Sequence, residues 1–221
     1  MPYDEEIVRL FLLPLGPKLQ LSEWEKFGIS FEEREKINQY KHWQDWQRAI
    51  LGSILLRWML KTFLNLGEVK ISRNEKGRPY LLEVDKNWNV DFNLSHSGEW
   101  IVAAITKNSS VGVDVEKIEE LNEDILPFVL SEKELMTIKR LSKYEQTKKF
   151  YELWTIKESI YKTGLFPNLT LESINTFEFN KKDIKTHTFY IDQHHPVAIS
   201  WHGAHTSIIK KTVLTRDKIL D

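Results

Sequence analysis

Residues 109–118 read SSVGVDVEKI, a valine-rich segment with two acids near its end. Successive side chains of a strand point to opposite faces, so Asp114 and Glu116 project together while the three valines project the other way. Two neighbouring carboxylates repel each other unless water, a proton or a cation neutralises them. The segment therefore predicts either a sheet-edge strand with one solvated face or a strand whose acids bind a cation.

The composition is that of a folded globular protein. Of the 221 residues, 41% are hydrophobic and eight are tryptophan, enough to form the core of one domain or two. A formal net charge of −1 gives no reason to expect a nucleic-acid or membrane partner. The absence of cysteine excludes disulfides, thiolate metal sites and a cysteine nucleophile. The first residues lack a signal peptide's positive region, and no apolar run spans a bilayer, so we expect a cytoplasmic protein.

The pattern of expected elements repeats loosely in two halves. In the first half, helical spacing over residues 30–40 and 45–63 precedes strand-like runs at 69–72, 78–84, 90–94 and 100–107. In the second half, helical segments at 130–141 and 145–164 precede strand-like runs at 173–179, 187–191, 196–201 and 207–215. Gly164 is expected to cap the second long helix. We predict an α+β fold with antiparallel sheets, in which residues 1–108 and 109–221 form two similar halves.

A second segment that could carry chemistry is WTIKESIYK, residues 154–162. On a helix, Glu158 and Lys162 fall on one face, with Lys157 beside them. An ordinary Glu–Lys helix pair would explain this spacing. Alternatively, Glu158 adds a third carboxylate to those of Asp114 and Glu116, and three such oxygen ligands would suit Mg²⁺.

Two turn-like segments are open to a plain structural interpretation. FNLSHSGEW, residues 92–100, places Ser95 and His96 before a Ser-Gly turn between two apolar strands. NEKGRPYL, residues 74–81, places Gly77 and Pro79 between two other strand-like runs. Neither segment alone requires more than a turn.

Together and in this order, four segments resemble the 4′-phosphopantetheinyl transferases of the surfactin-synthetase-activating type. They are KGRPY (76–80), NLSHSGEW (93–100), VGVDVEKI (111–118) and FYELWTIKESIYKTG (150–164). The most specific feature is the GVDVE motif followed, 42 residues after Glu116, by Glu158 inside W-x-x-K-E-S-x-x-K. The resemblance implies that family's fold, with two α+β halves related by a pseudo-twofold axis, and a monomer whose site lies between the halves.

The resemblance also implies an activity. Such enzymes move the phosphopantetheine arm of coenzyme A onto a serine of an apo acyl or peptidyl carrier protein and release adenosine 3′,5′-bisphosphate. Asp114, Glu116 and Glu158 would hold Mg²⁺, or Mn²⁺, against the pyrophosphate. Glu158 would also be the general base, and Lys162 would stabilise charge on the departing nucleotide, with Lys157 adding to the positive field.

The nucleotide end of coenzyme A is assigned by the same resemblance. The implied contacts are Ser95 and His96 with phosphate, Arg48 and Lys36 as further basic positions, and Gly77, Arg78 and Pro79 as the adenine-side turn. One position departs from the family pattern, since Glu33 stands where members often carry a lysine. Binding of the 3′-phosphate would then depend on compensation, for which Lys41 and Arg34 are candidates.

The implied partner is an acidic, mostly helical carrier domain of peptide, polyketide or fatty-acid synthesis. Phe128, Lys133 and Lys139 are candidate docking residues, although packing of this segment into the core would explain its apolar residues equally well. Two alternatives remain: a Mg²⁺-dependent hydrolase of pyrophosphates, and a non-catalytic protein that binds coenzyme A or carriers.

Overall fold

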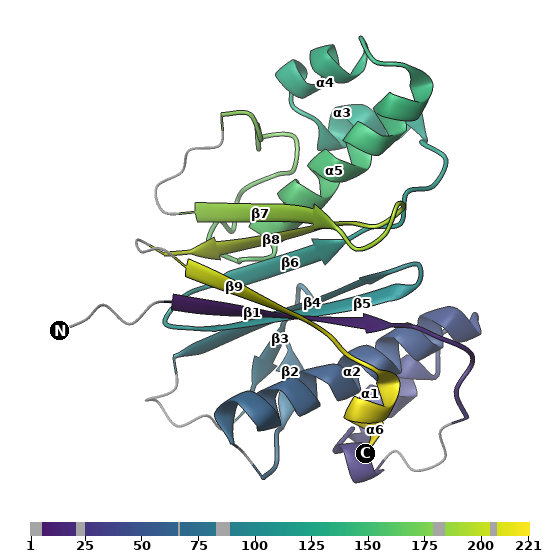
Figure 1. The fold of residues 1–221 in the computed structure, drawn as a ribbon, viewed down its shortest axis with the longest axis vertical. Coiled ribbons are helices and arrows are strands. Elements are labelled where there is room, and N and C mark those ends of the chain that lie inside the picture. The colour runs from purple at the N-terminus through teal and green to yellow at the C-terminus, as the bar shows by residue number, and fades with distance from the viewer. Residues whose placement is uncertain (1–5, 21–24, 66, 83–88, 179–183, 204–206) are drawn as a thin grey trace, which may run out of the picture.

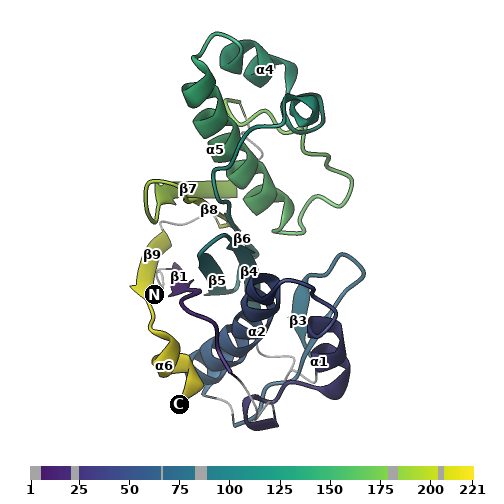
Figure 2. The ribbon, with the colours of Figure 1, turned by 90° about the vertical axis from the view of Figure 1, so that its right-hand side faces the viewer.

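The computed structural model of the chain describes residues 6–20, 25–65, 67–82, 89–178, 184–203 and 207–221. In these segments helices pack on sheets whose strand pairs are mostly antiparallel, as Figures 1 and 2 show. The predicted α+β class is thereby confirmed. Within these segments, no helix combines the length and the apolar character needed to cross a lipid bilayer.

The first sheet has four strands in the order β4-β5-β1-β9. Their bounds are Val90–Ser97 (β4), Trp100–Lys107 (β5), Glu6–Pro14 (β1) and Ser207–Val213 (β9). All neighbours are antiparallel except β1 and β9, which run parallel. The end of the chain therefore returns to the sheet that contains its beginning, and the boundary at residues 108 and 109 stays a prediction.

Helices cover one face of this sheet. They are η1 (Glu25–Phe27), α1 (Phe31–Ile37), α2 (Trp43–Leu64) and α6 (Arg216–Leu220). The predictions for residues 30–40 and 45–63 are confirmed by α1 and α2. Helix α1 begins where the Ser30 hydroxyl accepts a hydrogen bond from the backbone N–H of Glu33, and α2 ends at Asn65 in the left-handed conformation.

The second sheet has three strands in the order β6-β8-β7, packed against the long helix α5. The strands are Val111–Val115 (β6), Pro196–His202 (β8) and Ile184–Tyr190 (β7), and the helices are η2 (Glu123–Ile125), α3 (Leu126–Val129), α4 (Glu132–Ile138) and α5 (Lys143–Tyr161). Gly164 lies just beyond α5 with φ +74°, as expected of a cap. The strand predicted at 173–179 is wrong, because residues 173–178 form turns joined by irregular backbone; residue 179 is outside the described segments.

Two layers of core explain why residues 100–107 are apolar at almost every position. Ile101, Ala103 and Ile105 pack with the helix side of the first sheet. Val102 and Ala104 face the opposite way and pack with β6 and β8. Strand β5 is therefore buried on both faces, which removes the usual alternation of apolar and polar residues.

Side chains of β4 join the first sheet to the open edge of β6. The backbone N–H of Val111 donates to Asp91 Oδ2 (2.7 Å) and that of Val113 to Asn93 Oδ1 (3.1 Å). The N–H of Lys117 donates to Ser97 Oγ (2.9 Å) in the same manner. Every residue of β6 is buried, so the interpretation of this strand as a solvated sheet edge is wrong.

The hairpin of β2 (Ile71–Arg73) and β3 (Pro79–Leu81) stands beside the first sheet. The side chain of Asn74 shapes its turn by accepting hydrogen bonds from the backbone N–H groups of Lys76 and Arg78. Gly77 completes the turn with φ +77°, a conformation that favours glycine.

Candidate active site

The two acids of the opening motif lie where β6 meets the end of α5. A side chain at Gly112 could not be accommodated, because its Cβ would lie 2.0 Å from the carbonyl oxygen of Ser159. This close approach brings Asp114 to Lys162, the C-terminal cap of α5. The Lys162 Nζ donates to Asp114 Oδ1 at 2.5 Å, and the Ser95 hydroxyl donates to the same oxygen at 2.8 Å.

The second oxygen of Asp114 has no such partner. Oδ2 is buried and makes no hydrogen bond within the described part of the chain. Burial raises the pKa of Asp114 above its ordinary value, against the opposing effect of Lys162. A buried acceptor without a donor is costly and points to a missing ligand.

Two more carboxylates lie beside Asp114. Glu116 accepts a hydrogen bond from the Ser97 hydroxyl at 3.0 Å, and Glu158 Oε2 lies 3.9 Å from Lys162 Nζ. Burial, reinforced by the charge of Asp114, raises the pKa of Glu116 to about 7. Burial also raises the pKa of Glu158. The three acids repel one another, so a cation would stabilise their ionised forms.

Whether these acids fit a divalent cation can be judged from their chemistry. Carboxylate oxygens are the ligands that Mg²⁺ prefers, and the orphan Oδ2 of Asp114 offers one directly. The described residues contain no group of three or more histidine or acidic side chains already spaced as metal ligands. Instead the ammonium group of Lys162 lies against Asp114. The carboxylate oxygens are therefore of the chemical type that binds Mg²⁺.

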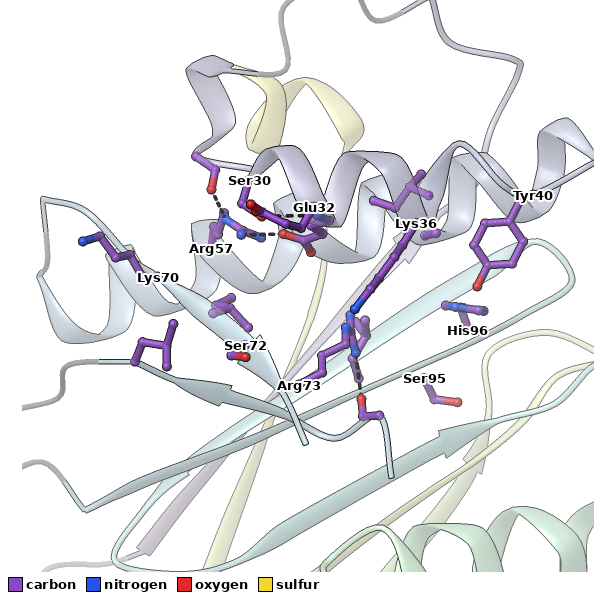
Figure 3. A pocket seen from close by; sticks show the side chains of 18 of the residues that line it. Ser30, Glu32, Lys36, Tyr40, Arg57, Lys70, Ser72, Arg73, Ser95 and His96 are labelled. Carbon is purple, nitrogen blue, oxygen red and sulfur yellow. Dashed lines mark hydrogen bonds and ion pairs between the residues drawn. The ribbon is translucent and has the colours of Figure 1, made fainter. Parts of the chain in front are cut away.

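A pocket of about 820 Å³ opens beside these acids, a size typical of ligand sites. Its walls come from α1, α2, the β2–β3 hairpin, the end of β4 and the start of the second half (Figure 3). Of the residues predicted for the site, seven line it: Lys36, Gly77, Ser95, His96, Asp114, Glu116 and Lys162. Glu158 is absent from its lining, but it lies beside Lys162 and its charge interacts with those of Asp114 and Glu116.

The prediction that Lys157 adds to the positive field at the substrate is wrong. Its side chain is fully buried, and its Nζ lies 2.6 Å from Glu134 Oε2. The ammonium group also donates to the carbonyl oxygens of Leu171 and Ile174. Lys157 and Lys162 project from different sides of α5, and only Lys162 reaches the pocket.

Arg78 and Arg48 are also outside the pocket lining. Arg78 donates to Asp91 Oδ2 (2.6 Å) and to the carbonyl oxygens of Val111 and Lys162, so its side chain ties the hairpin to the second half. Arg48 donates to Asp45 (2.5 Å) and to the carbonyl oxygen of Gly98 (2.7 Å).

Pro79 is buried behind the same turn. Together with Gly77 and Arg78, it lines a smaller neighbouring pocket of about 320 Å³. The adenine-side role given to this turn stays a prediction, carried by Gly77, which borders both pockets.

His96 opens onto the pocket, and Figure 3 shows the hydroxyl group of Tyr40 pointing toward it. Desolvation, followed by the nearby charge of Arg48, lowers the pKa of His96 to about 4. The ring is therefore neutral at neutral pH and can donate one N–H to an anion. Tyr40 was not predicted as a site residue.

The sequence analysis also missed a group of charged residues at the other end of the pocket. They are Arg57, Lys70 and Arg73, together with the neighbouring acid Glu32. Arg57 forms an ion pair with Glu33 (2.7 Å), although its neighbours in residues 54–60 of α2 are all apolar. A lone arginine among leucines is a sequence signal that could have revealed this pair.

Comparison with known proteins identifies relatives along most of the chain. The family described as "4′-phosphopantetheinyl transferase, N-terminal" matches residues 20–108, and the "4′-phosphopantetheinyl transferase superfamily" matches residues 110–215. The 4′-phosphopantetheinyl transferase gsp of Aneurinibacillus migulanus is 32% identical over 78% of this chain and 70% of its own length. The 4′-phosphopantetheinyl transferase Sfp of Bacillus subtilis is 31% identical over 76% and 75%. A human L-aminoadipate-semialdehyde dehydrogenase-phosphopantetheinyl transferase is 29% identical over 61% and 48%.

Proposed function

Because this chain belongs to the 4′-phosphopantetheinyl transferase superfamily, we propose a mechanism in which its carboxylate cluster and Lys162 carry out the transfer. The enzyme moves the phosphopantetheine arm of coenzyme A to carrier proteins. We propose in addition which residues carry out the transfer, which cation they bind and which carriers are modified.

Asp114, Glu116 and Glu158 would hold Mg²⁺, with Mn²⁺ as a substitute. The observation that carries this assignment is the buried, unpartnered Oδ2 of Asp114 within a cluster of acids whose pKa values are raised. When bound, the cation supplies charge neutralisation for the pyrophosphate oxygens.

The protein's own groups account for the remaining steps. Glu158 accepts the proton of the carrier serine, directly or through a water molecule, as the hydroxyl oxygen attacks the phosphorus next to the pantetheine. The P–O bond to the departing adenosine bisphosphate breaks, and the ammonium group of Lys162 stabilises the charge that develops there. Ser95, which hydrogen-bonds both Asp114 and Lys162, keeps these two groups in place.

At the nucleotide end, Lys36 and neutral His96 bind the phosphate of the ribose, and the Gly77 turn receives the adenine. These residues line one continuous pocket with Asp114 and Glu116. Coenzyme A would thus extend from the cationic end of the pocket to its acidic end.

The carriers would be apo acyl or peptidyl carrier domains of peptide, polyketide or fatty-acid synthesis. Phe128, 74% exposed, and the exposed Lys133 and Lys139 lie on the surface formed by α3, α4 and the turn that follows, where an acidic carrier could dock. We further propose that the enzyme is a cytoplasmic monomer.

The test is the intact mass of a panel of apo carriers after incubation with enzyme, coenzyme A and Mg²⁺. We expect one phosphopantetheine mass to be added, and none in EDTA or with Asp114→Asn. Thermal melting of the variant must match the wild type, so that loss of activity is not loss of fold. Consumption of coenzyme A without any carrier change would instead support a pyrophosphate hydrolase, and binding of coenzyme A without consumption would support a non-catalytic protein.

A further inference from the structure

Two cationic side chains converge in the pocket from different elements. Lys36 comes from α1 and Arg73 from the end of β2, and Figure 3 shows them pointing toward one another. Neither forms an ion pair with any residue in the described segments; the one side-chain hydrogen bond of Arg73 goes to the carbonyl oxygen of Gly77 at 3.0 Å. Both side chains are exposed, so water screens their repulsion, and an anion placed between them would be attracted by both.

The position of Arg73 is set by the hairpin that carries it. Arg73 pairs with Pro79 across the hairpin, and its bond to Gly77 spans the intervening turn. Since Asn74 and Gly77 fix that turn, the hydrogen bond to Gly77 limits the positions open to the exposed guanidinium group. Burial lowers the pKa of Arg73, against the opposing effect of the Glu33 charge, and an arginine remains charged at neutral pH.

The carboxylate of Glu33 forms its contacts with residues other than Lys36 and Arg73, although its charge still raises the pKa of Arg73. Its Oε2 pairs with Arg57 Nη2 at 2.7 Å, and its Oε1 accepts a hydrogen bond from the Ser53 hydroxyl at 2.5 Å. Arg57 is itself 4% exposed and also donates to the carbonyl oxygen of Gly28. Both residues line the pocket, but they are already paired with one another, so together they add no net charge to it.

We propose that Arg73, with Lys36, binds the 3′-phosphate of coenzyme A and supplies the positive charge that Glu33 does not provide. The proposal rests on the transferase function above. Coenzyme A carries one phosphate monoester, a dianion at neutral pH, and a planar guanidinium group suits such a group with two parallel hydrogen bonds. The pyrophosphate belongs at the other end of the pocket, near Asp114 and Lys162, where the reaction occurs.

Arg34 and Lys41 were the candidates for this compensation, and neither borders the pocket. Arg34 stacks over the ring of Phe31, with 5.4 Å between its guanidinium carbon and the ring centroid. Arg73 thus has the compensating role for which the sequence had indicated Arg34 in α1 or Lys41 after it.

The test compares coenzyme A with 3′-dephospho-coenzyme A, which lacks only the phosphate in question. For Arg73→Gln we expect the KM and the Kd for coenzyme A to rise about 10- to 100-fold, the range for a lost charge-assisted contact, with kcat changed by less than about threefold. Both constants for 3′-dephospho-coenzyme A should be the same as in the wild type. Arg73→Lys should recover part of the affinity, because it keeps the charge but loses the second hydrogen bond.

A matched control is Lys210→Gln, which removes one exposed positive charge from β9, outside the pocket lining. It should leave both nucleotides unaffected. The proposal is overturned if Arg73→Gln weakens coenzyme A and its dephospho form equally, or weakens neither. Calorimetric Kd values for the two nucleotides test the role of Arg73 without any carrier. Failure of the carrier-modification assay would therefore refute the proposed function without affecting the test of Arg73.

Discussion

Helix α5 and its C-terminal cap carry two lysines, Lys157 and Lys162, that each form an ion pair with a carboxylate from another element. The two pairs differ in how many of their donors and acceptors have a hydrogen-bond partner. Lys157 Nζ contacts Glu134, Leu171 and Ile174, so all three ammonium donors are used. Glu134 in turn accepts hydrogen bonds from Ser131 and Thr176. Although burial alone would raise the pKa of Glu134, the hydrogen bond from Lys157 foremost, and then those from Thr176 and Ser131, lower it below its ordinary value.

Five residues further along the helix, the pair of Lys162 and Asp114 is incomplete. One oxygen of Asp114 has no partner within the described residues, and Glu116 and Glu158 add further negative charge. The pKa of Asp114 is raised by burial, the opposite direction to that of Glu134.

The difference distinguishes two uses of the same chemistry. A buried ion pair with every lone pair and proton in use holds elements together, and removing one partner leaves a buried charge. A pair with an unused acceptor is unfavourable for the fold alone, and its atoms become satisfied only when a ligand arrives. Each variant below tests one side of this contrast.

The largest effect should come from the complete pair. Lys157→Met keeps the length of the side chain but leaves Glu134 charged and two carbonyl groups without a donor. We expect the free energy of unfolding, measured by urea denaturation, to fall by about 3–5 kcal/mol. The double variant with Glu134→Gln should recover part of that loss, because the uncompensated charge is gone. Equal stability of Lys157→Met and the wild type would contradict the structural role.

Asp114→Asn tests the incomplete pair. We expect carrier modification, measured as kcat/KM, to fall at least about 100-fold, or about 2.7 kcal/mol. The free energy of unfolding without metal should change by less than about 1 kcal/mol, because removing a carboxylate with a raised pKa offsets the lost bond to Lys162. Mg²⁺ should raise the melting temperature of the wild type and not that of the variant. A variant that melts higher with Mg²⁺, like the wild type, would remove Asp114 from the ligand set.

Much of the fold follows from residue pattern alone. Helices α2 and α5 were predicted because their apolar residues recur at helical spacing over many residues, and strands β5 and β8 because each is a short, largely apolar run. Strand β1 was not predicted, and neither was its parallel pairing with β9, which joins residues about two hundred positions apart and leaves no local signal.

The wrong strand at 173–179 has a physical reason. Its β-branched and aromatic residues suit a strand, but the chain turns there, and the carbonyl oxygen of Ile174 and the N–H of Thr176 bind the Lys157–Glu134 pair. The acids of the site could be predicted because GVDVE and the α5 motif are specific. Residue spacing alone could not show that Lys157 is buried while Lys162 reaches the pocket. Arg73 lies in a short hairpin strand whose sequence gives no sign that it borders the pocket.

A smaller effect, with a pH dependence, is expected at Asp192 in the turn between β7 and β8. Its carboxylate accepts hydrogen bonds from the N–H of His194 and from Trp100 Nε1, both at 2.8 Å, and contacts His195 Nδ1 at 2.8 Å. Burial raises the pKa of Asp192, but these bonds, that of His195 foremost, lower it to about 2. Like Glu134, Asp192 therefore has hydrogen-bond partners for both carboxylate oxygens, but its side chain is 41% exposed.

Because the folded pKa lies below the unfolded one, the stabilisation is present above about pH 4 and is lost as the pH falls toward about 2. We expect Asp192→Asn to lower the free energy of unfolding by about 1 kcal/mol at neutral pH, a value reduced by solvent screening. The difference from the wild type, measured by denaturation at several pH values, should shrink toward zero in acid. A pH-independent difference would mean that the charge of Asp192 does not contribute.

The smallest effect on stability should come from exposed lysines. Lys133 forms an ion pair with Glu178, and both side chains are about 60% exposed. Such pairs contribute little, so Lys133→Glu with Lys139→Glu should change the free energy of unfolding by less than about 0.5 kcal/mol. If an acidic carrier docks here, the KM for the carrier should rise about two- to fivefold, while the KM for coenzyme A stays constant.

The matched control reverses the same number of charges elsewhere, with Lys210→Glu and Lys218→Glu on exposed positions of β9 and α6. An equal rise in carrier KM for both double variants would reflect net charge alone and would remove Lys133 and Lys139 from the docking surface. A rise in carrier KM confined to the Lys133→Glu and Lys139→Glu variant would instead place the carrier on the second half of the chain. Loss of stability could not explain such a rise, because these substitutions leave the free energy of unfolding unchanged.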